Sequence, residues 1–542
     1  MGGQGSKVPA VKRLPRRQFR AERSPAESDG RRMSLYPISY DTFAHAARHR
    51  RCSAAGAVTL CGLFLILSGC SRPEPADPSP RWSDVKLRLL VVGDPAMASA
   101  IEPLRAEWNA QTGSTFELRQ AEKLDPAAPG PPDVDAIILP GYEIGALAEK
   151  QWIIPLPNEL IERPRTFQPP EKQDQKTAGG WNEIFSLLRA REAAWGSQIV
   201  AVPFGSPVLT CYYRADLLER LGTRPPRTWA EYRRLSEQLA DRAKLGDLAP
   251  PAGAPWSGTL EPLGSGWAGL VLIARAAPYV THRSNYSALF KIDTMEPLID
   301  GPPFVQALEE LVAVATSGPP DQLALDPAGV RRAFWQGRCG LALTWPTAAD
   351  RGPFPESRNL NVGFAELPGS NRAYNVSAGN WETRPPGEGS TSPLLGISGR
   401  MGVVTSVAPM ESREAAFHLL MWLSSDQWNR HVSAASPMTT MFRHSDRDFP
   451  RAWVESPVSA SAAAQYAEIT ASTLTGGQAL FAPRLPGRSE YLAALDEAVH
   501  QAVRRQKRPL DALRQAGNRW REITARLGKE AQQRAYLHSL GL

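Results

Sequence analysis

The sequence predicts an α/β fold in which strands alternate with helices around a parallel sheet. Lys86 to Val92 and Asp135 to Leu139 are predominantly apolar segments of strand length, and each is followed by turn-forming residues. Between them, Ile101, Leu104 and Trp108 follow helical spacing. Strands that alternate with helices in this way are typical of βαβ units. With 542 residues of ordinary globular composition, the chain is long enough for two domains.

The predicted elements of the first domain follow one another closely. The first strand ends at Gly93-Asp94, and the helix after it ends near Gly113. A second strand begins at 116–118, and Pro140-Gly141 closes the third, after which a helical stretch starts at Ile144. Ligands of parallel sheets bind at the carboxyl ends of strands. Residues 93–94 and 141–143 therefore form a candidate binding edge.

The rest of the chain is predicted to be rich in helices. Amphipathic spacing predicts helices around residues 230–240, 304–315, 416–423 and 492–503. Residues 367–402 and 436–460 are rich in Gly, Pro and Ser, and are predicted to be loops that cross between lobes.

The formal net charge of +7 is concentrated in the leader. Residues 1–69 contain twelve Lys/Arg and four Asp/Glu, so the remaining residues carry a net charge of about −1. The basic character therefore belongs to the leader, and the sequence does not predict a nucleic-acid-binding surface on the folded body.

The leader has the features of a secretory signal. Four residues, Arg48 to Arg51, precede an apolar run from Ala54 to Leu67, which is shorter than a membrane-spanning helix requires. The sequence Leu67-Ser68-Gly69-Cys70 resembles the bacterial lipobox, which implies cleavage before Cys70 and acylation of its thiol. The alternative is an uncleaved N-terminal anchor. The Pro-rich stretch from Ser71 to Pro80 favours a lipidated tether. The expected location is therefore periplasmic or cell-surface, with a lipid anchor in a membrane.

Two cysteines follow Cys70, namely Cys211 and Cys339. An exported compartment permits a disulfide between them, and two buried free thiols are the alternative. No cysteine pair has the spacing of zinc ligands, so no metal site is expected.

The segment from Ala201 to Glu231 carries a recognisable pattern. Its Ala-Val-Pro-Phe-Gly string, its Tyr-Tyr-Arg-Ala-Asp string and its Pro-Pro-Arg-Thr-Trp-Ala-Glu helix start together resemble the family 1 extracellular solute-binding proteins, which include maltose-binding protein. Arg214-Ala215 replaces the Asn-Lys that is common there. Physically, Thr228 and Glu231 have capping-box spacing. Residues 333–346, 362–369 and 414–426, and residues from Arg484 onward, are similar to further segments in family order.

The resemblance implies a two-lobed periplasmic-binding-protein-like fold of type 2, with hinged α/β lobes and a ligand cleft. The expected organisation is a leader at 1–69, a tether at 70–84, a first lobe at 85–204 and 377–440, and a second lobe at 205–376 and 441–542. The implied function is capture of a solute for the permease of an ABC importer, and the tryptophan content favours a carbohydrate. The implied protein is a monomer without cofactor or catalytic residues. A secreted glycoside hydrolase and a ligand sensor for a signalling partner are the alternatives.

Candidate solute-binding residues combine aromatic rings with polar groups, because sugars offer C–H faces to rings and hydroxyls to polar side chains. Trp345 is the first candidate, since it follows a strand where the family carries a cleft aromatic; a core position is its alternative. Tyr142 and Glu143 lie at the predicted binding edge. The further candidates are Trp267 and Phe204, with Trp381, Arg484 and Tyr491 near the later crossings.

Two other patterns favour different chemistry only weakly. Gly264 to Gly269 matches G-x-G-x-x-G, but a dinucleotide site requires a strand before the motif, and Pro and Gly residues precede it here. Tyr212-Tyr213 could suggest iron, yet adjacent residues of a strand point to opposite faces.

Overall fold

The computed structural model describes residues 82–125, 128–161, 178–350, 360–385 and 390–542. The chain divides into a unit that ends at Glu74 and a unit Pro75–Leu542, to which every described residue belongs. The predicted leader, Cys70 and most of the tether lie outside the described residues. Within the described part, no helix is both long and apolar enough to span a lipid bilayer.

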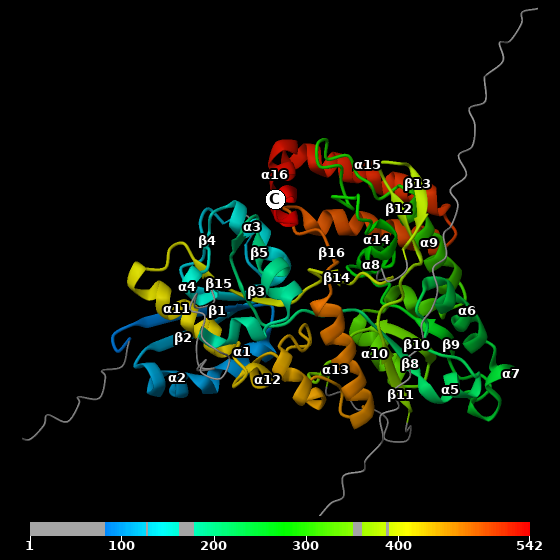
Figure 1. Cartoon of the computed structure of the whole chain (residues 1–542), viewed down its shortest axis with the longest axis horizontal. Coiled ribbons are helices and arrows are strands. Elements are labelled where there is room, and N and C mark those ends of the chain that lie inside the picture. Colours follow the sequence, from blue (N-terminus) through cyan, green and yellow to red (C-terminus); the bar gives the residue numbers. More distant parts are fainter. Residues whose placement is uncertain (1–81, 126–127, 162–177, 351–359, 386–389) are drawn as a thin grey trace, which may run out of the picture. The chain divides into compact units, whose positions relative to one another are not determined.

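The first sheet has the strand order β2-β1-β3-β15-β4, and β7 also pairs with β15 (Figure 1). Its strands are β1 Lys86–Val92, β2 Thr115–Ala121, β3 Ala136–Pro140, β4 Ile153–Ile154, β7 Val202–Pro203 and β15 Arg400–Thr405. β1 runs parallel to β2 and to β3, which confirms the predicted parallel arrangement. Val91 lies opposite Ile138, so β1 and β3 end at the same edge of the sheet. β15 runs antiparallel to β3, and it therefore begins at that edge.

The helix predicted after β1 is divided in the structure. α1 (Pro95–Ile101) and α2 (Arg105–Thr112) are separated by a 3₁₀ turn, η1 (Glu102–Leu104). Pro103 lies inside this turn, and proline offers no backbone N–H for a continuous helix. The predicted end is confirmed, because Gly113 caps α2 in the left-handed conformation. The other helical elements of this part are η2 Gly141–Glu143, α3 Ile144–Glu149, α4 Asn158–Ile161, η4 Ala178–Glu183, the π-helical turn η5 Leu188–Glu192, α11 Met410–Leu423 and α12 Asn429–Val432.

The second sheet has the strand order β11-β8-β10-β9. Its strands are β8 Thr210–Arg214, β9 Ser257–Leu260, β10 Cys339–Thr344 and β11 Val362–Ala365. Its helical elements are α5 Ala215–Arg220, α6 Trp229–Ala240, α7 Arg242–Leu245, η6 Gly246–Leu248, α8 Ala268–Val280, α9 Pro302–Ala315, η7 Pro320–Ala324, α10 Pro327–Trp335 and α13 Ala460–Thr475. The predicted capping box of α6 is confirmed, with Thr228 and Glu231 each bonding the other's backbone N–H.

Three short ladders complete the strands, namely β5 Ala194–Trp195 with β6 Gln198–Ile199, β12 Arg372–Asn375 with β13 Asn380–Thr383, and β14 Leu394–Leu395 with β16 Leu480–Phe481. The β12–β13 hairpin lies inside the stretch 367–402 that was predicted to be a loop, so that prediction is wrong there. The predicted lobe boundary at 376/377 falls in the same hairpin. Since β12 packs on α8 and α9, we propose that the second lobe continues through Thr383.

The chain passes between the two sheets along segments defined here as the lobe crossings. The first, 204–209, joins β7 to β8, and the second, 392–399, leads through β14 to β15. A third, 440–458, leads from the first sheet's part toward α13 and contains η8 His444–Asp448 and η9 Pro450–Ala452. Thr440 Oγ1 donates to the backbone oxygen of Ser206 at 2.7 Å, which joins the first and third crossings.

The last three helices, α14 Arg488–Val503, α15 Pro509–Leu527 and α16 Lys529–Leu540, follow β16. α14 packs on α8 and α15. α16 has two sets of neighbours (Figure 1). Tyr536 packs on Phe290 with ring centroids 5.2 Å apart, whereas His538 Nδ1 lies 2.5 Å from Glu149 at the end of α3. α16 therefore contacts the parts built on both sheets.

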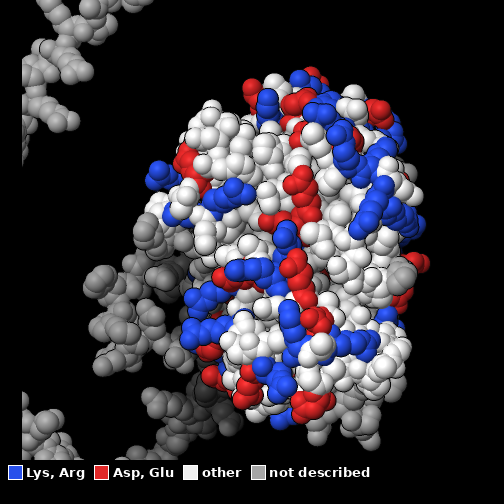
Figure 2. Space-filling view, turned by 90° about the vertical axis from the view of Figure 1, so that its right-hand side faces the viewer, with Lys and Arg blue, Asp and Glu red and all other residues white. Residues whose placement is uncertain are grey.

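The surface carries charges of both signs. Figure 2 shows Lys and Arg side chains interleaved with Asp and Glu side chains, and the cations gather most densely toward the upper right. Exposed ion pairs include Arg447–Glu468 and Arg519–Glu522.

Cys211 and Cys339 are both buried and are free thiols. Cys211 lies opposite Leu343 in the β8–β10 ladder, so the two cysteines do not face each other across it. Of the two predicted alternatives, the structure has the free thiols.

Candidate functional site

Three segments meet at the edge of the first sheet where β1 and β3 end. Gly93-Asp94 follows β1, Gly141 to Glu143 follows β3, and Ser398-Gly399 precedes β15. The backbone N–H of Gly141 donates to the oxygen of Gly399 at 3.1 Å, and Pro140 lies opposite Arg400 in the ladder. Residues from three strands are thus held side by side at the predicted binding edge.

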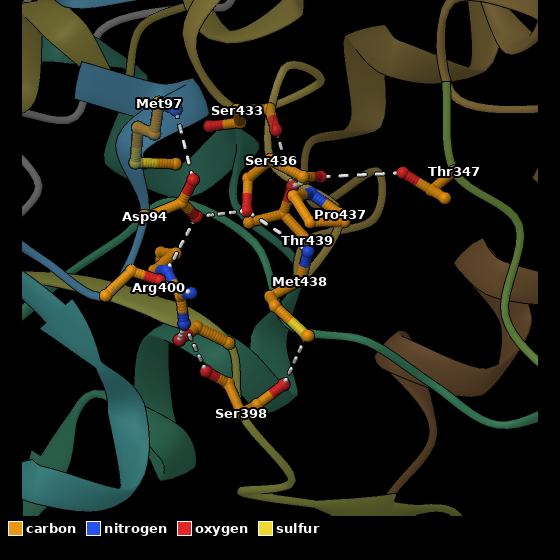
Figure 3. Close-up of polar contacts among 12 residues, drawn as sticks. Asp94, Met97, Thr347, Ser398, Arg400, Ser433, Ser436, Pro437, Met438 and Thr439 are labelled. Atoms are coloured by element: carbon orange, nitrogen blue, oxygen red, sulfur yellow. Dashed lines mark hydrogen bonds and ion pairs between the residues drawn. The ribbon is translucent and has the colours of Figure 1, made fainter. Parts of the chain in front are cut away.

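Asp94 is hydrogen-bonded through both of its carboxylate oxygens at this edge (Figure 3). Its Oδ1 accepts the N–H of Met97 at 3.0 Å, which caps α1. Its Oδ2 accepts both from Arg400 Nε at 2.8 Å and from the Ser436 hydroxyl. Asp94 is buried, and Arg400 also donates to the carbonyl of Gly93 at 2.9 Å. Asp94 therefore positions its neighbours and has little capacity left for a ligand.

The segment 433–440 continues from Asp94 toward the second sheet (Figure 3). The Ser436 hydroxyl accepts the N–H of Met438 at 3.1 Å, which turns the chain sharply. Trp345 Nε1 donates to the backbone oxygen of Pro437 at 3.0 Å, and Thr347 Oγ1 approaches the oxygen of Ser436 at 3.5 Å. Trp345 and Thr347 follow β10, so this loop joins the ends of strands from both sheets.

Trp345 forms an aromatic pair with Trp267. Their ring centroids are 5.6 Å apart at an interplanar angle of 49°. Trp345 is 1% exposed, whereas Trp267 is half-buried and follows the exposed Gly266. Asp496 positions Trp267, because its carboxylate accepts the N–H groups of Gly266 at 2.5 Å and of Gly269 at 2.7 Å. The pair therefore offers one protected and one accessible indole ring.

Tyr142 and Glu143 form the polar side of the same edge. Both are half-buried, and the guanidinium of Arg488 lies 4.0 Å from the Tyr142 ring centroid. Burial raises the pKa of Glu143, which the charge of Arg488 opposes. Burial lowers the pKa of Arg488 to about 10. Arg488 donates to the carbonyl of Ile397 at 2.8 Å, so the guanidinium is fixed in place by backbone.

The model of the family described as bacterial extracellular solute-binding protein matches residues 101–427. The chain belongs to this family. No curated protein sequence matches the chain.

Solved structures similar to this solute-binding protein share its two-lobed fold. They include an ABC transporter solute-binding protein of Agrobacterium radiobacter K84 in complex with ribitol, at 17% identity and a TM-score of 0.56, covering 81% of this chain and 99% of that one. Maltose-bound MalE3 of T. maritima has 19% identity and a TM-score of 0.55, with 81% and 100% covered. The sugar-binding protein MalE of Xanthomonas citri has 17% identity and a TM-score of 0.57, with 82% and 98% covered.

The predicted site residues of this solute-binding protein fall into two sets. Trp345 and Trp267 touch each other, and Tyr142 and Glu143 share the edge to which Trp345 is joined through Pro437. The remaining four predicted residues lie in other surroundings.

Phe204 and Tyr491 are core residues in this structure. Phe204 is fully buried and borders Gly402 of β15. Tyr491 is also fully buried, and its ring centroid lies 5.1 Å from that of Trp520 while its hydroxyl bonds Thr524 at 2.9 Å. Neither ring is accessible to a solute in this arrangement.

Trp381 and Arg484 bind other parts of the protein. Trp381, on β13, is surrounded by Tyr279, Tyr374 and Arg372, at ring-centroid distances of 5.6, 5.3 and 4.5 Å respectively. Arg484 is buried, and it donates to the carbonyls of Glu192 and Ser539.

Sequence reasoning missed Arg400, Ser436 and Arg488. Arg400 had a visible signal, since it is a lone cation at the start of an otherwise apolar strand, and such a charge requires a partner. Ser436 and Arg488 lie in stretches of ordinary loop and helix-start composition, which carry no such signal. Among the described residues, no group of three or more His, Cys, Asp or Glu side chains is arranged to hold a metal ion.

Proposed function

We propose that this protein captures a small sugar or polyol outside the cell and delivers it to the permease of an ABC-type importer. The observation that carries the proposal is the junction of Trp345 with Pro437, which brings an indole pair from the second sheet to the polar edge of the first. An aromatic surface that is joined to an edge carrying a carboxylate and a guanidinium suits the C–H faces and hydroxyl groups of a carbohydrate.

The proposal gives a different role to each of the four candidate residues at the two sheets, namely Trp267, Trp345, Glu143 and Tyr142. Trp267 stacks on the solute, because it is the accessible ring of the pair. Trp345 supports Trp267 and borders the solute when the lobes move. Glu143 accepts a solute hydroxyl, and Tyr142 packs beside it under Arg488. Asp94 holds Arg400 and Ser436 in place and does not contact the solute.

Uptake of this kind needs binding and release, and no bond of the solute is changed. A solute that contacts both lobes stabilises the arrangement in which they are close, since only differential contacts shift such an equilibrium. The closed lobes then present a changed surface to the permease. Relatives by fold were solved with ribitol, D-mannitol, α-D-tagatose, maltose and mannobiose, which supports a sugar or polyol as the solute class here.

The direct test is a thermal-shift series with those five compounds, followed by calorimetry for each compound that stabilises the protein. At a hundredfold excess over Kd, a bound solute adds about 2.7 kcal/mol to the free energy of unfolding. Trp267→Ala is expected to remove the shift. The matched control is Trp256→Ala, because Trp256 is also a partly buried indole but donates to Leu239 away from the junction.

A shift that survives in Trp267→Ala would place the solute elsewhere. Chromatography of the incubated sugars distinguishes the alternative of a glycoside hydrolase, because a binding protein returns each sugar unchanged.

We further propose that Cys70 is acylated and that the segment after it tethers the protein to a membrane. The lipobox-like sequence and the Pro-rich stretch from Ser71 to Pro80 support this. Cys70→Ser is expected to move the protein from the membrane to the soluble fraction. An unchanged membrane fraction would instead indicate an uncleaved N-terminal anchor.

A further inference from the structure

Glu192 is a buried carboxylate beside the lobe crossings. It ends the π-helical turn η5, and it is fully buried. Single π-helical turns are uncommon and are often found at functional positions. An acidic side chain without solvent access needs partners, because an unpaired buried charge costs several kcal/mol.

One carboxylate oxygen of Glu192 joins two crossings. Oε1 accepts the Ser206 hydroxyl at 2.8 Å, in the first crossing, and the N–H of Gly396 at 3.1 Å, in the second. Gly396 and Gly205, the neighbour of Ser206, have φ angles of +70° and +106°. Such angles favour glycine, so both crossings contain a residue with unusual backbone freedom beside the carboxylate.

The other carboxylate oxygen has no partner among the described residues. Glu192 Oε2 is enclosed without a hydrogen bond, and so is Nε of the neighbouring Arg484. Arg484 instead donates from Nη1 to the backbone oxygen of Glu192 at 2.7 Å and from Nη2 to Ser539 at 3.0 Å. An acceptor and a donor of opposite charge are thus both buried and both left unsatisfied, which is costly for each.

The charges of the two groups already act on each other. Burial raises the pKa of Glu192, and the charge of Arg484 opposes that rise. Burial lowers the pKa of Arg484 to about 10, and the charge of Glu192 opposes that fall.

We propose that Glu192 and Arg484 are positioning residues that form a two-position switch between the lobes. In the arrangement described, Glu192 ties the first and second crossings together through Ser206 and Gly396. In a second arrangement, the crossings move away from η5, and Glu192 Oε2 accepts a hydrogen bond from Arg484 Nε. Each arrangement then satisfies a bond that the other leaves open, which is what a bistable hinge requires. Neither residue touches the solute.

Two substitutions should move this equilibrium in opposite directions. Ser206→Ala removes a donor that holds Glu192 in the arrangement described, so it favours the second arrangement. Glu192→Gln keeps an oxygen for Ser206 and Gly396 but loses the attraction to Arg484, so it favours the arrangement described. Both changes are close to isosteric.

The experiment measures the distance between the lobes in the full chain without solute. Fluorophores on unnatural amino acids at Gln111 of α2 and Lys244 of α7, both exposed, report this distance by single-molecule energy transfer. The expected result is two distance populations, whose ratio changes at least tenfold in opposite directions for the two variants. Ser257→Ala is the matched control, since the buried Ser257 hydroxyl bonds Thr259 within the second sheet.

The proposed switch would be overturned if the wild type and all three variants had equal population ratios. It would also be overturned if Ser206→Ala and Glu192→Gln changed the ratio in the same direction. If one variant does not fold, the direction in which the other variant changes the population ratio still tests the switch, because a direction is predicted for each variant. No solute is used, so a failure here is distinct from a failure of the proposed sugar-binding function.

Discussion

The indole nitrogen of Trp345 lies 3.0 Å from the backbone oxygen of Pro437. Trp345 follows a strand of the second sheet, whereas the neighbour of Pro437, Ser436, bonds Asp94 at the edge of the first. This hydrogen bond, beside the longer one of 3.5 Å from Thr347 to Ser436, joins the two sheets at the candidate site. Its removal should be visible both in stability and in binding.

Trp345→Phe keeps an aromatic ring against Trp267 and removes the donor. The free energy of unfolding is expected to fall by about 1 kcal/mol in urea titrations, the usual net value of such a bond. The affinity for whichever sugar stabilises the wild type is also expected to change. Trp256→Phe serves as the control, because it loses a similar bond, to Leu239, away from the junction. The same change of affinity in both variants would contradict the role given to Trp345.

Asp94→Asn tests the buried pair of Asp94 and Arg400. The substitution leaves the Arg400 guanidinium buried without a counter-charge, and breaking such a pair typically costs about 3–5 kcal/mol. Chemical denaturation measures this loss. The control is Asp133→Asn, whose carboxylate lies 2.5 Å from Arg88 but is 85% exposed, so its loss should stay below about 1 kcal/mol. Equal losses would mean that burial does not set the strength of the first pair.

Glu455 makes stability depend on pH. Burial raises the pKa of its carboxyl from 4.5 to about 7, although Arg331 lowers it and Tyr212 donates to it at 3.0 Å. Between these values the folded state holds a proton that the unfolded state has released, so stability falls as the pH rises from about 4.5 to about 7. The loss attributable to Glu455 is about 3 kcal/mol at most.

The measurement is the difference in unfolding free energy between the wild type and Glu455→Gln across that range. Other buried acids such as Glu192 and Asp446 also have raised pKa values, and their contribution cancels in the difference. A difference that is independent of pH would show that Glu455 titrates normally.

Cys211 and Cys339 should not react with thiol reagents in the folded protein. Both are buried, and burial raises the pKa of each thiol, so little thiolate is present. Peptide mass mapping after iodoacetamide treatment should find both unmodified under native conditions and both alkylated in denaturant. Resistance to alkylation in denaturant without reductant would indicate a disulfide between them.

The sequence predicted the parallel strands β1 and β3 of the first sheet because both are largely buried. Predominantly apolar runs such as Lys86–Val92 are typical of central parallel strands, and the direction of the strands defines the edge at which they end. The β12–β13 hairpin was missed because its strands are four residues each and half exposed, so no apolar pattern marks them.

The candidate site was predictable only in part. Trp345 and Glu143 are predicted as site residues because aromatic and acidic side chains at strand ends are suited to binding a sugar. The bonds of Asp94 with Arg400 and Ser436 span more than 300 positions of sequence, and no local pattern indicates them. The rings of Trp345, Tyr491 and Phe204 are all buried, and of the three only Trp345 pairs with the half-buried Trp267, because such contacts are defined by the fold and not by local sequence.

The double attachment of α16 has a consequence for how the protein can be handled. Tyr536 packs on the ring of Phe290, and His538 contacts Glu149 at the end of α3, so the final helix links the parts built on the two sheets. A purification tag placed after the exposed Leu542 should be tolerated. A chain that ends at Gly528 would lack α16, and it would therefore lose the contacts of this helix with the Glu149 carboxylate and with the ring of Phe290.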